Sequence, residues 1–283
     1  MEICRSVAEI RAAVAGYRAA SQSVGLVTTM GALHAGHMAL VAAARAEQER
    51  VVATIFVNPA QFGEAADLAS YPRTEAEDLQ MLQAAGVDAV LLPDVATIYP
   101  EGDETIVETT RLASRLHGAV RPGHFRGVTT VVARLFNICL PDAAYFGEKD
   151  YQQLAVIRRM ARDLHFPLRV VGVPTVRAPD GLALSSRNAR LTPEDRAAAP
   201  VLKRALDAGA AAAPGGVTAV AEAIRTTLAT EPRAVLEGLD IVDPLTFEPA
   251  TGAVDRPLGI MLSARFGQGA DAVLLIDQME IAP

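Results

Sequence analysis

VGLVTTMGALHAGHMAL, residues 24–40, joins the pattern of a buried strand to the pattern of a helix. Residues 24–29 are apolar and rich in β-branched side chains, which favours a strand. Residues 36–49 are rich in alanine and predict a helix. The next segment, RVVATIFVN at 50–58, is a continuous apolar run, as in strands that are buried on both faces. The succession predicts a βαβ unit with parallel strands.

The same alternation continues to about residue 176. Further helices are predicted at 74–86, 127–140 and 150–164, and further strands at 88–93, 143–147 and 168–176. Thr74 and Glu77 are spaced like a capping box, and Gly86 ends that helix. The polar, glycine-rich 121–127 is predicted to be a loop. The pattern predicts the α/β class, with a Rossmann-like doubly wound parallel sheet and a ligand site at the carboxyl ends of its strands.

The composition changes near residue 180. A helix is predicted to begin at Thr192, with Pro193 in its first turn, and a second follows the PGG at 214–216. Strands are predicted near 234–243, 258–266 and 272–277. We therefore expect residues 1–178 to form the Rossmann-like domain and residues 179–283 a smaller C-terminal α+β domain.

Charge and cysteine content narrow the class of protein. The chain of 283 residues has a formal net charge of −7, which disfavours binding to nucleic acid. Cys4 and Cys139 suggest neither a disulfide framework nor a metal motif, and Cys139 is expected to be a buried thiol. The N-terminus lacks the pattern of a signal peptide, and no apolar run approaches the ~20 residues of a membrane span. A cytoplasmic protein without a membrane segment is expected.

The two histidines of HAGH, His34 and His37, lie at the predicted start of a helix. A helix N-terminus attracts anions, and residues three apart project from the same side of its first turn. The small residues Gly31, Ala32, Ala35 and Gly36 are expected to let a ligand approach the backbone. Two imidazole donors suit a phosphate chain on which charge develops. The alternatives are that the histidines only cap the helix, or that they bind zinc, for which no third ligand lies nearby.

Three further segments offer polar side chains after predicted strands. FGEKDYQQ at 146–153, ALSSRNARL at 183–191 and NPAQFG at 58–63 supply Lys149, Gln153, Ser185, Ser186, Arg187, Asn58 and Gln61. The cations and hydroxyls suit phosphate oxygens, and the amides suit a small polar substrate. Each segment also has a purely structural interpretation: a solvated Lys–Asp pair, a plain turn, and a proline turn capped by asparagine.

Together with YPRT and RPGHFRGV, these segments resemble the successive motifs of the pantothenate synthetase (pantoate–β-alanine ligase) family over about residues 24–190. HxGH alone marks a broader nucleotidyltransferase superfamily, whereas FGEKDYQQ with SSRN is much more specific. The similarity is incomplete at Thr28, Leu184 and Arg134, where the family usually has Pro, Met and Lys.

The resemblance implies an ATP-dependent, AMP-forming ligase of pantothenate biosynthesis, the route to coenzyme A. In this family the pantoate carboxylate attacks the α-phosphorus of ATP, and the amine of β-alanine then attacks the pantoyl adenylate. The expected substrates are ATP with Mg²⁺ on its phosphates, pantoate and β-alanine, and the expected assembly is a homodimer. The C-terminal domain is expected to close over the site.

The resemblance also assigns residues. The catalytic set is His37, His34, Lys149 and Arg187. Pantoate is expected at Gln61 and Gln153, and β-alanine at Gln61; no metal ligand is assigned. The residues expected to bind ATP are Met30, Gly31, Ala32, Leu33, His34, Ala35, Gly36, His37, Gly147, Glu148, Lys149, Asp150, Val176, Leu184, Ser185, Ser186 and Arg187.

Two other functions stay open at this stage. A nucleotidyltransferase that moves AMP or CMP onto a phosphorylated alcohol would share HAGH, but has no need of Gln61 and Gln153. A nucleotide- or RNA-binding module descended from a synthetase is the alternative without catalysis, and the acidic charge weighs against RNA.

Overall fold

The computed structural model describes residues 1–63, 68–69, 71–269 and 272–283. It divides into two compact units. The first comprises residues 1–147 and 152–173, and the second comprises residues 148–151 and 174–283. The short segment 148–151 thus groups with the C-terminal part of the chain.

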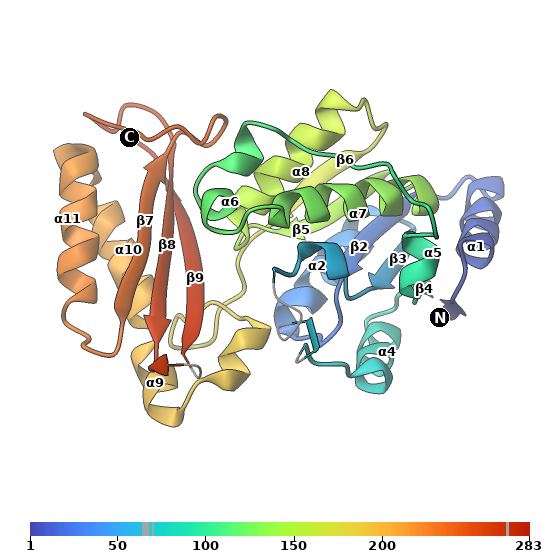
Figure 1. The fold of residues 1–283 in the computed structure, drawn as a ribbon, viewed down its shortest axis with the longest axis horizontal. Helices are drawn as coiled ribbons and strands as arrows, with labels where there is room; N and C mark the ends of the chain where they lie inside the picture. The colour runs from blue at the N-terminus through green and yellow to red at the C-terminus, as the bar shows by residue number, and fades with distance from the viewer. Residues whose placement is uncertain (64–67, 70, 270–271) are drawn as a thin grey trace. The chain divides into compact units, whose positions relative to one another are not determined.

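The first unit is built on a six-stranded sheet in the order β1-β4-β3-β2-β5-β6 (Figure 1). All of its strand pairs are parallel. The strands are β1 (Glu2–Cys4), β2 (Val24–Thr29), β3 (Arg50–Ile55), β4 (Ala89–Leu91), β5 (Ala143–Gly147) and β6 (Arg169–Val173). The predicted α/β class and parallel sheet are confirmed.

The strand order reverses at β2. From β2 the chain proceeds outward through β3 to β4 on one side, and it resumes at β5 on the other side of β2. In open parallel sheets, ligands bind at the carboxyl ends of the strands beside such a reversal. The HAGH turn follows β2 directly, so the fold places it at this point.

Helices cover both faces of this sheet, because successive strand residues point to opposite sides. Val52 packs in the same core cluster as α1, α7 and α8, whereas Val51 and Ala53 pack with α2 and α4. The helices of this unit are α1 (Val7–Ala19), α2 (Ala35–Glu47), α4 (Glu75–Ala84), α5 (Val95–Ile98), α6 (His117–Val120), α7 (His124–Cys139) and α8 (Tyr151–Asp163), of which Tyr151 groups with the second unit.

Three local predictions are corrected. Strand β3 ends at Ile55 rather than at residue 58, because Asn58 caps the 3₁₀ turn η1 (Pro59–Gln61). Residues 124–127 belong to α7 and not to a loop. The predicted capping box of α4 is absent, because Thr74 makes no side-chain cap bond and its hydroxyl donates instead to Asp78 Oδ2 over 3.2 Å.

The second unit contains an antiparallel sheet in the order β7-β8-β9, with α10 and α11 against one face (Figure 1). Its elements are η3 (Ser186–Arg190), α9 (Pro193–Ala198), α10 (Val201–Ala211), η4 (Ala213–Gly215), α11 (Gly216–Leu228), β7 (Val235–Val242), β8 (Leu258–Phe266) and β9 (Val273–Ile281). Thr192 caps α9 as predicted. The predicted smaller α+β fold is confirmed, and β9 is longer than expected.

Both cysteines are free and buried, as expected for Cys139. Burial raises the pKa of Cys4 to about 11 and that of Cys139 to about 12, so both thiols stay protonated and unreactive at neutral pH. Among the described residues, no helix combines the length and the apolar character needed to cross a bilayer.

Candidate active site

His34 and His37 are joined by a hydrogen bond at the start of α2. His34 is the N-cap residue, and its Nδ1 accepts the Gly36 N–H over 3.1 Å. The Nδ1 of His37 accepts the His34 N–H over 3.3 Å. The ring centroids lie 4.1 Å apart. Because each Nδ1 accepts a backbone hydrogen, each ring is neutral with its own hydrogen on Nε2, the atom that is able to donate to a phosphate oxygen.

The turn that leads into these rings has an unusual backbone. Thr29 Oγ1 donates to the Thr54 carbonyl over 2.8 Å and accepts the Gly31 N–H over 3.2 Å. Gly31 and Ala32 then both have positive φ, 83° and 51°. Alanine seldom adopts this left-handed conformation, so the turn needs support from outside itself.

That support comes from the carboxylate of Asp78 on α4. It accepts the Ala32 N–H over 3.0 Å and the Leu33 N–H over 2.8 Å. These two backbone donors therefore bond to the protein's own carboxylate.

The hydrogen bonds of the Asn58 side chain determine which way the Gln61 amide is turned. Asn58 Oδ1 accepts the Ala60 N–H over 3.2 Å, so Asn58 Nδ2 must be the donor to the Gly127 carbonyl, 3.1 Å away. Nδ2 also donates to Gln61 Oε1 over 3.1 Å. The Gln61 amide is thereby fixed with Oε1 toward Asn58 and its NH₂ group on the other side. Gln61 is suited to a substrate that brings an acceptor oxygen.

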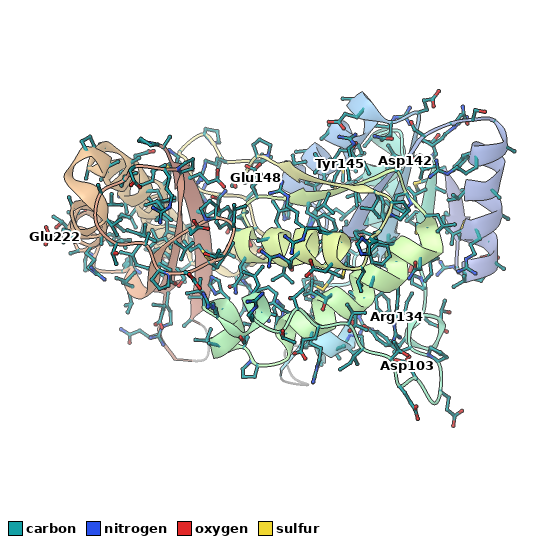
Figure 2. The ribbon with its side chains drawn as sticks, turned by 90° about the horizontal axis from the view of Figure 1, so that it is seen from above. Asp103, Arg134, Asp142, Tyr145, Glu148 and Glu222 are labelled. Carbon is teal, nitrogen blue, oxygen red and sulfur yellow. The ribbon has the colours of Figure 1, made fainter. Side chains whose placement is uncertain are left out.

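Tyr99 stabilises the Asn58 side chain that orients Gln61. Its hydroxyl donates to Asn58 Oδ1 over 2.7 Å, and burial raises the pKa of Tyr99 to about 12, so the phenol keeps its proton. The Arg134 guanidinium lies 4.6 Å from the Tyr99 ring centroid and pairs with both oxygens of Asp103 (Figure 2). Asn58, only 1% exposed, thus positions the Gln61 amide.

Gln61 also connects two other segments of the first unit. Its Nε2 donates to Met30 Sδ over 2.9 Å, which brings the segments after β2 and β3 together. Its backbone carbonyl lies 2.9 Å from Nδ1 of His124. Because a carbonyl only accepts, His124 carries a hydrogen on Nδ1 and anchors η1 to α7.

In the second unit, a tight hairpin joins two of the predicted ATP contacts. The Leu184 N–H donates to the Val176 carbonyl over 2.9 Å, and the Ser185 hydroxyl caps η3 by accepting the Arg187 N–H over 3.3 Å. Behind the hairpin, Arg177 pairs through two hydrogen bonds with Asp277, which is 2% exposed. The structure therefore holds Val176 and Leu184 side by side, with Ser185, Ser186 and Arg187 directly after them.

The segment that contains Lys149 is anchored to the antiparallel sheet through Tyr151. The Tyr151 hydroxyl donates to Glu280 Oε1 over 2.7 Å, and a Cβ on Gly259 would lie 2.5 Å from the Tyr151 ring. Lys149 Nζ lies 3.5 Å from the carboxylate of Asp150, with 17% of its side chain exposed. This ammonium lies in the same compact unit as the hairpin.

The predicted site residues fall into both units. The first unit holds residues 30–37, Gln61, Gly147 at the end of β5, and Gln153 in the first turn of α8. The second unit holds residues 148–150, Val176 and residues 184–187. That residues 30–37, 147–150, Val176 and 184–187 bind ATP, and that Gln61 and Gln153 bind pantoate, stays a prediction. In the described parts of the chain, no three His, Cys, Asp or Glu side chains come together as a metal-ion ligand set.

A parallel sheet with a histidine-containing turn at the reversal of its strand order has the architecture of nucleotide-binding α/β proteins. The sequence profile of the pantoate–beta-alanine ligase family matches residues 2–280. The chain belongs to this family.

Individual relatives agree with the profile. The pantothenate synthetase of Sinorhizobium medicae (strain WSM419) is 51% identical, over 100% of this chain and 97% of its own length. The crystal structure of pantothenate synthetase from Thermus thermophilus covers 100% of both chains at 49% identity and a TM-score of 0.92. The Francisella tularensis pantoate–beta-alanine ligase, crystallised with a β,γ-ATP compound and beta-alanine, covers 99% of this chain and 97% of its own at 32% identity and a TM-score of 0.78.

Proposed function

We propose that the chain condenses pantoate with β-alanine in two steps. A pantoate carboxylate oxygen bonds to the α-phosphorus of ATP, and the bond from that phosphorus to pyrophosphate breaks. The amine nitrogen of β-alanine then bonds to the pantoyl carbonyl carbon, the bond to AMP breaks, and the amine loses a proton. The substrates supply both nucleophiles, so the protein acts by positioning and electrostatics.

The observation that supports this proposal is the orientation of the hydrogen-bond donors in the first unit, namely the His34 and His37 rings and the Gln61 amide. The His34 and His37 rings are held with hydrogens on Nε2, which suits the charge that develops on phosphate oxygens. The Gln61 amide is held with its NH₂ group away from Asn58, which suits a carboxylate or hydroxyl oxygen of pantoate. A transferase acting on a phosphorylated alcohol has no need of the second group.

Several finer points belong to the same proposal. ATP enters as its Mg²⁺ complex, a substrate whose metal keeps several waters. Lys149, Ser185, Ser186 and Arg187 of the second unit supply further donors to the phosphates. The C-terminal domain closes over the labile adenylate and keeps water from it. The enzyme works in the cytoplasm as a homodimer.

Release of pyrophosphate and of AMP from ATP and Mg²⁺ tests the two steps separately. With pantoate alone we expect about one pyrophosphate per active site and no free AMP, because the AMP group stays bound in the adenylate. Adding β-alanine should convert this burst into continuous turnover that releases AMP and an amide product. A stable nucleotide conjugate as the product, or neither pyrophosphate nor AMP under both conditions, would reject the ligase mechanism.

A further inference from the structure

Asp78 is a buried carboxylate with its bonds directed at the histidine turn. It is 2% exposed and lies in the first turn of α4. Oδ1 accepts the Leu33 N–H over 2.8 Å, and Oδ2 accepts the Ala32 N–H over 3.0 Å. The Thr74 hydroxyl also donates to Oδ2, over 3.2 Å. A buried charge is costly unless hydrogen bonds satisfy it, and here all three identified donors converge on it.

Asp78 and the Thr29 hydroxyl, which accepts the Gly31 N–H over 3.2 Å, both support this backbone. Gly31 and Ala32 have φ of 83° and 51°, so two successive residues are left-handed. In this conformation the N–H groups of Ala32 and Leu33 both donate to the Asp78 carboxylate. A Cβ on Gly31 would lie 3.0 Å from Asp78 Oδ2, so the carboxylate also packs closely against the turn.

His34 follows Leu33 directly, and its own N–H bonds to His37 Nδ1. A change in the path of residues 31–33 would therefore move the N–H of His34, and with it the bond that orients the His37 ring. Because adenyl transfer depends on placement of the donors around the α-phosphate, a displacement of about 1 Å is enough to cost ~100-fold in rate.

We propose that Asp78 is a positioning residue for adenylation: its carboxylate holds the turn at residues 31–33 and, through that turn, the orientation of His34 and His37. This role rests on the proposed ligase function, since it concerns the rate of that reaction. The competing role for a carboxylate near a nucleotide is to bind the Mg²⁺ of ATP, directly or through water.

Asp78→Asn separates these roles. The amide keeps one acceptor oxygen but turns an NH₂ group toward a backbone N–H. We expect kcat for AMP formation to fall about 30- to 100-fold, while the pantoate KM, which depends on Gln61, stays close to the wild-type value. Asp88→Asn is the matched control. Asp88 accepts the Val51 N–H over 2.8 Å at the amino end of β3, away from the site, and its variant should keep the wild-type kcat.

Nitrogen-15 NMR of the histidine rings gives a readout that does not depend on activity. In the wild type, His34 and His37 should show hydrogen on Nε2 alone, and in Asp78→Asn at least one ring should become a mixture of tautomers. Unchanged ring signals in a folded variant, or a rate restored by raised Mg²⁺, would overturn the positioning role. If the wild type formed no AMP, the proposed function would be rejected. The ring signals would still show whether Asp78 holds the turn at residues 31–33.

Thr74→Val provides a second variant in case Asp78→Asn does not fold. It removes the hydroxyl donor to Oδ2 and keeps the shape of the side chain. A smaller fall in kcat with the same change in the ring signals supports the proposal. Wild-type kcat and wild-type ring signals in Thr74→Val, with Asp78→Asn unfolded, would count against it.

Discussion

His37→Asn should lower the rate of AMP formation by about 100- to 1,000-fold, the usual cost of removing one donor from a transition-state anion site. Asparagine can place its Oδ1 near the position of His37 Nδ1, so the acceptor for the His34 N–H survives. What disappears is the donor at Nε2. The thermal midpoint should therefore change little, and the loss should appear in kcat measured as AMP release with pantoate, ATP and β-alanine.

Two variants make this prediction specific. His37→Gln can place its amide nitrogen near the Nε2 position, so it should recover part of the rate that Asn loses. His165→Asn changes an exposed histidine with φ of 54°, a conformation that asparagine tolerates, and should leave the rate unchanged. A His37→Asn enzyme with nearly the wild-type rate would remove His37 from the catalytic set.

Gly127→Ala should destabilise the first unit by about 3 kcal/mol or more, at the upper end of overpacking costs. A Cβ at Gly127 would lie 2.3 Å from the Ala60 carbonyl oxygen and 2.8 Å from the Gln61 nitrogen. These are backbone atoms that cannot turn aside, so η1 must move away from α7. Because Asn58 donates to the Gly127 carbonyl, the same movement disturbs the Gln61 amide, and the pantoate KM should rise.

The control for Gly127→Ala is Gly16→Ala in α1. Apart from its chain neighbours and the backbone of its own helix, no atom of the described residues lies within 4 Å of the position that a Cβ on Gly16 would take. Alanine at this helical position should stabilise the protein by about 0.5–1 kcal/mol. Urea unfolding of both variants measures the two free energies of unfolding. If both substitutions had the same small effect, the close packing of α7 against η1 would not matter for stability.

The sequence predicts best those features that depend on neighbouring residues. The strand at 24–29 was confirmed to the residue, and α2 within two residues, because periodic apolar side chains determine both. His34 and His37 could be proposed as a pair because they lie three residues apart, beside small residues, at a predicted helix start. The capping role that the sequence also allowed is present as well, since His34 is the N-cap of α2. Their tautomers needed the structure, since these depend on the hydrogen bonds of both Nδ1 atoms.

The features that the sequence did not reveal depend on distant segments. Asp78 is separated from Ala32 by 46 residues, and no local sequence pattern singled it out. Thr74 had the spacing of a capping box, yet its hydroxyl is bonded to that carboxylate. Residues 121–127 looked like a loop because of their glycines, whereas Gly127 is needed where α7 meets η1.

The most direct test of the central claim follows one oxygen atom. Pantoate labelled with oxygen-18 in its carboxylate is supplied with ATP, Mg²⁺ and β-alanine, and the products are analysed by mass spectrometry or phosphorus-31 NMR. If the carboxylate attacks the α-phosphorus, one labelled oxygen must appear in AMP and none in pyrophosphate. An unlabelled AMP, with the oxygen lost from the carboxylate found in water, in pyrophosphate or in another phosphate, would contradict the adenylate mechanism.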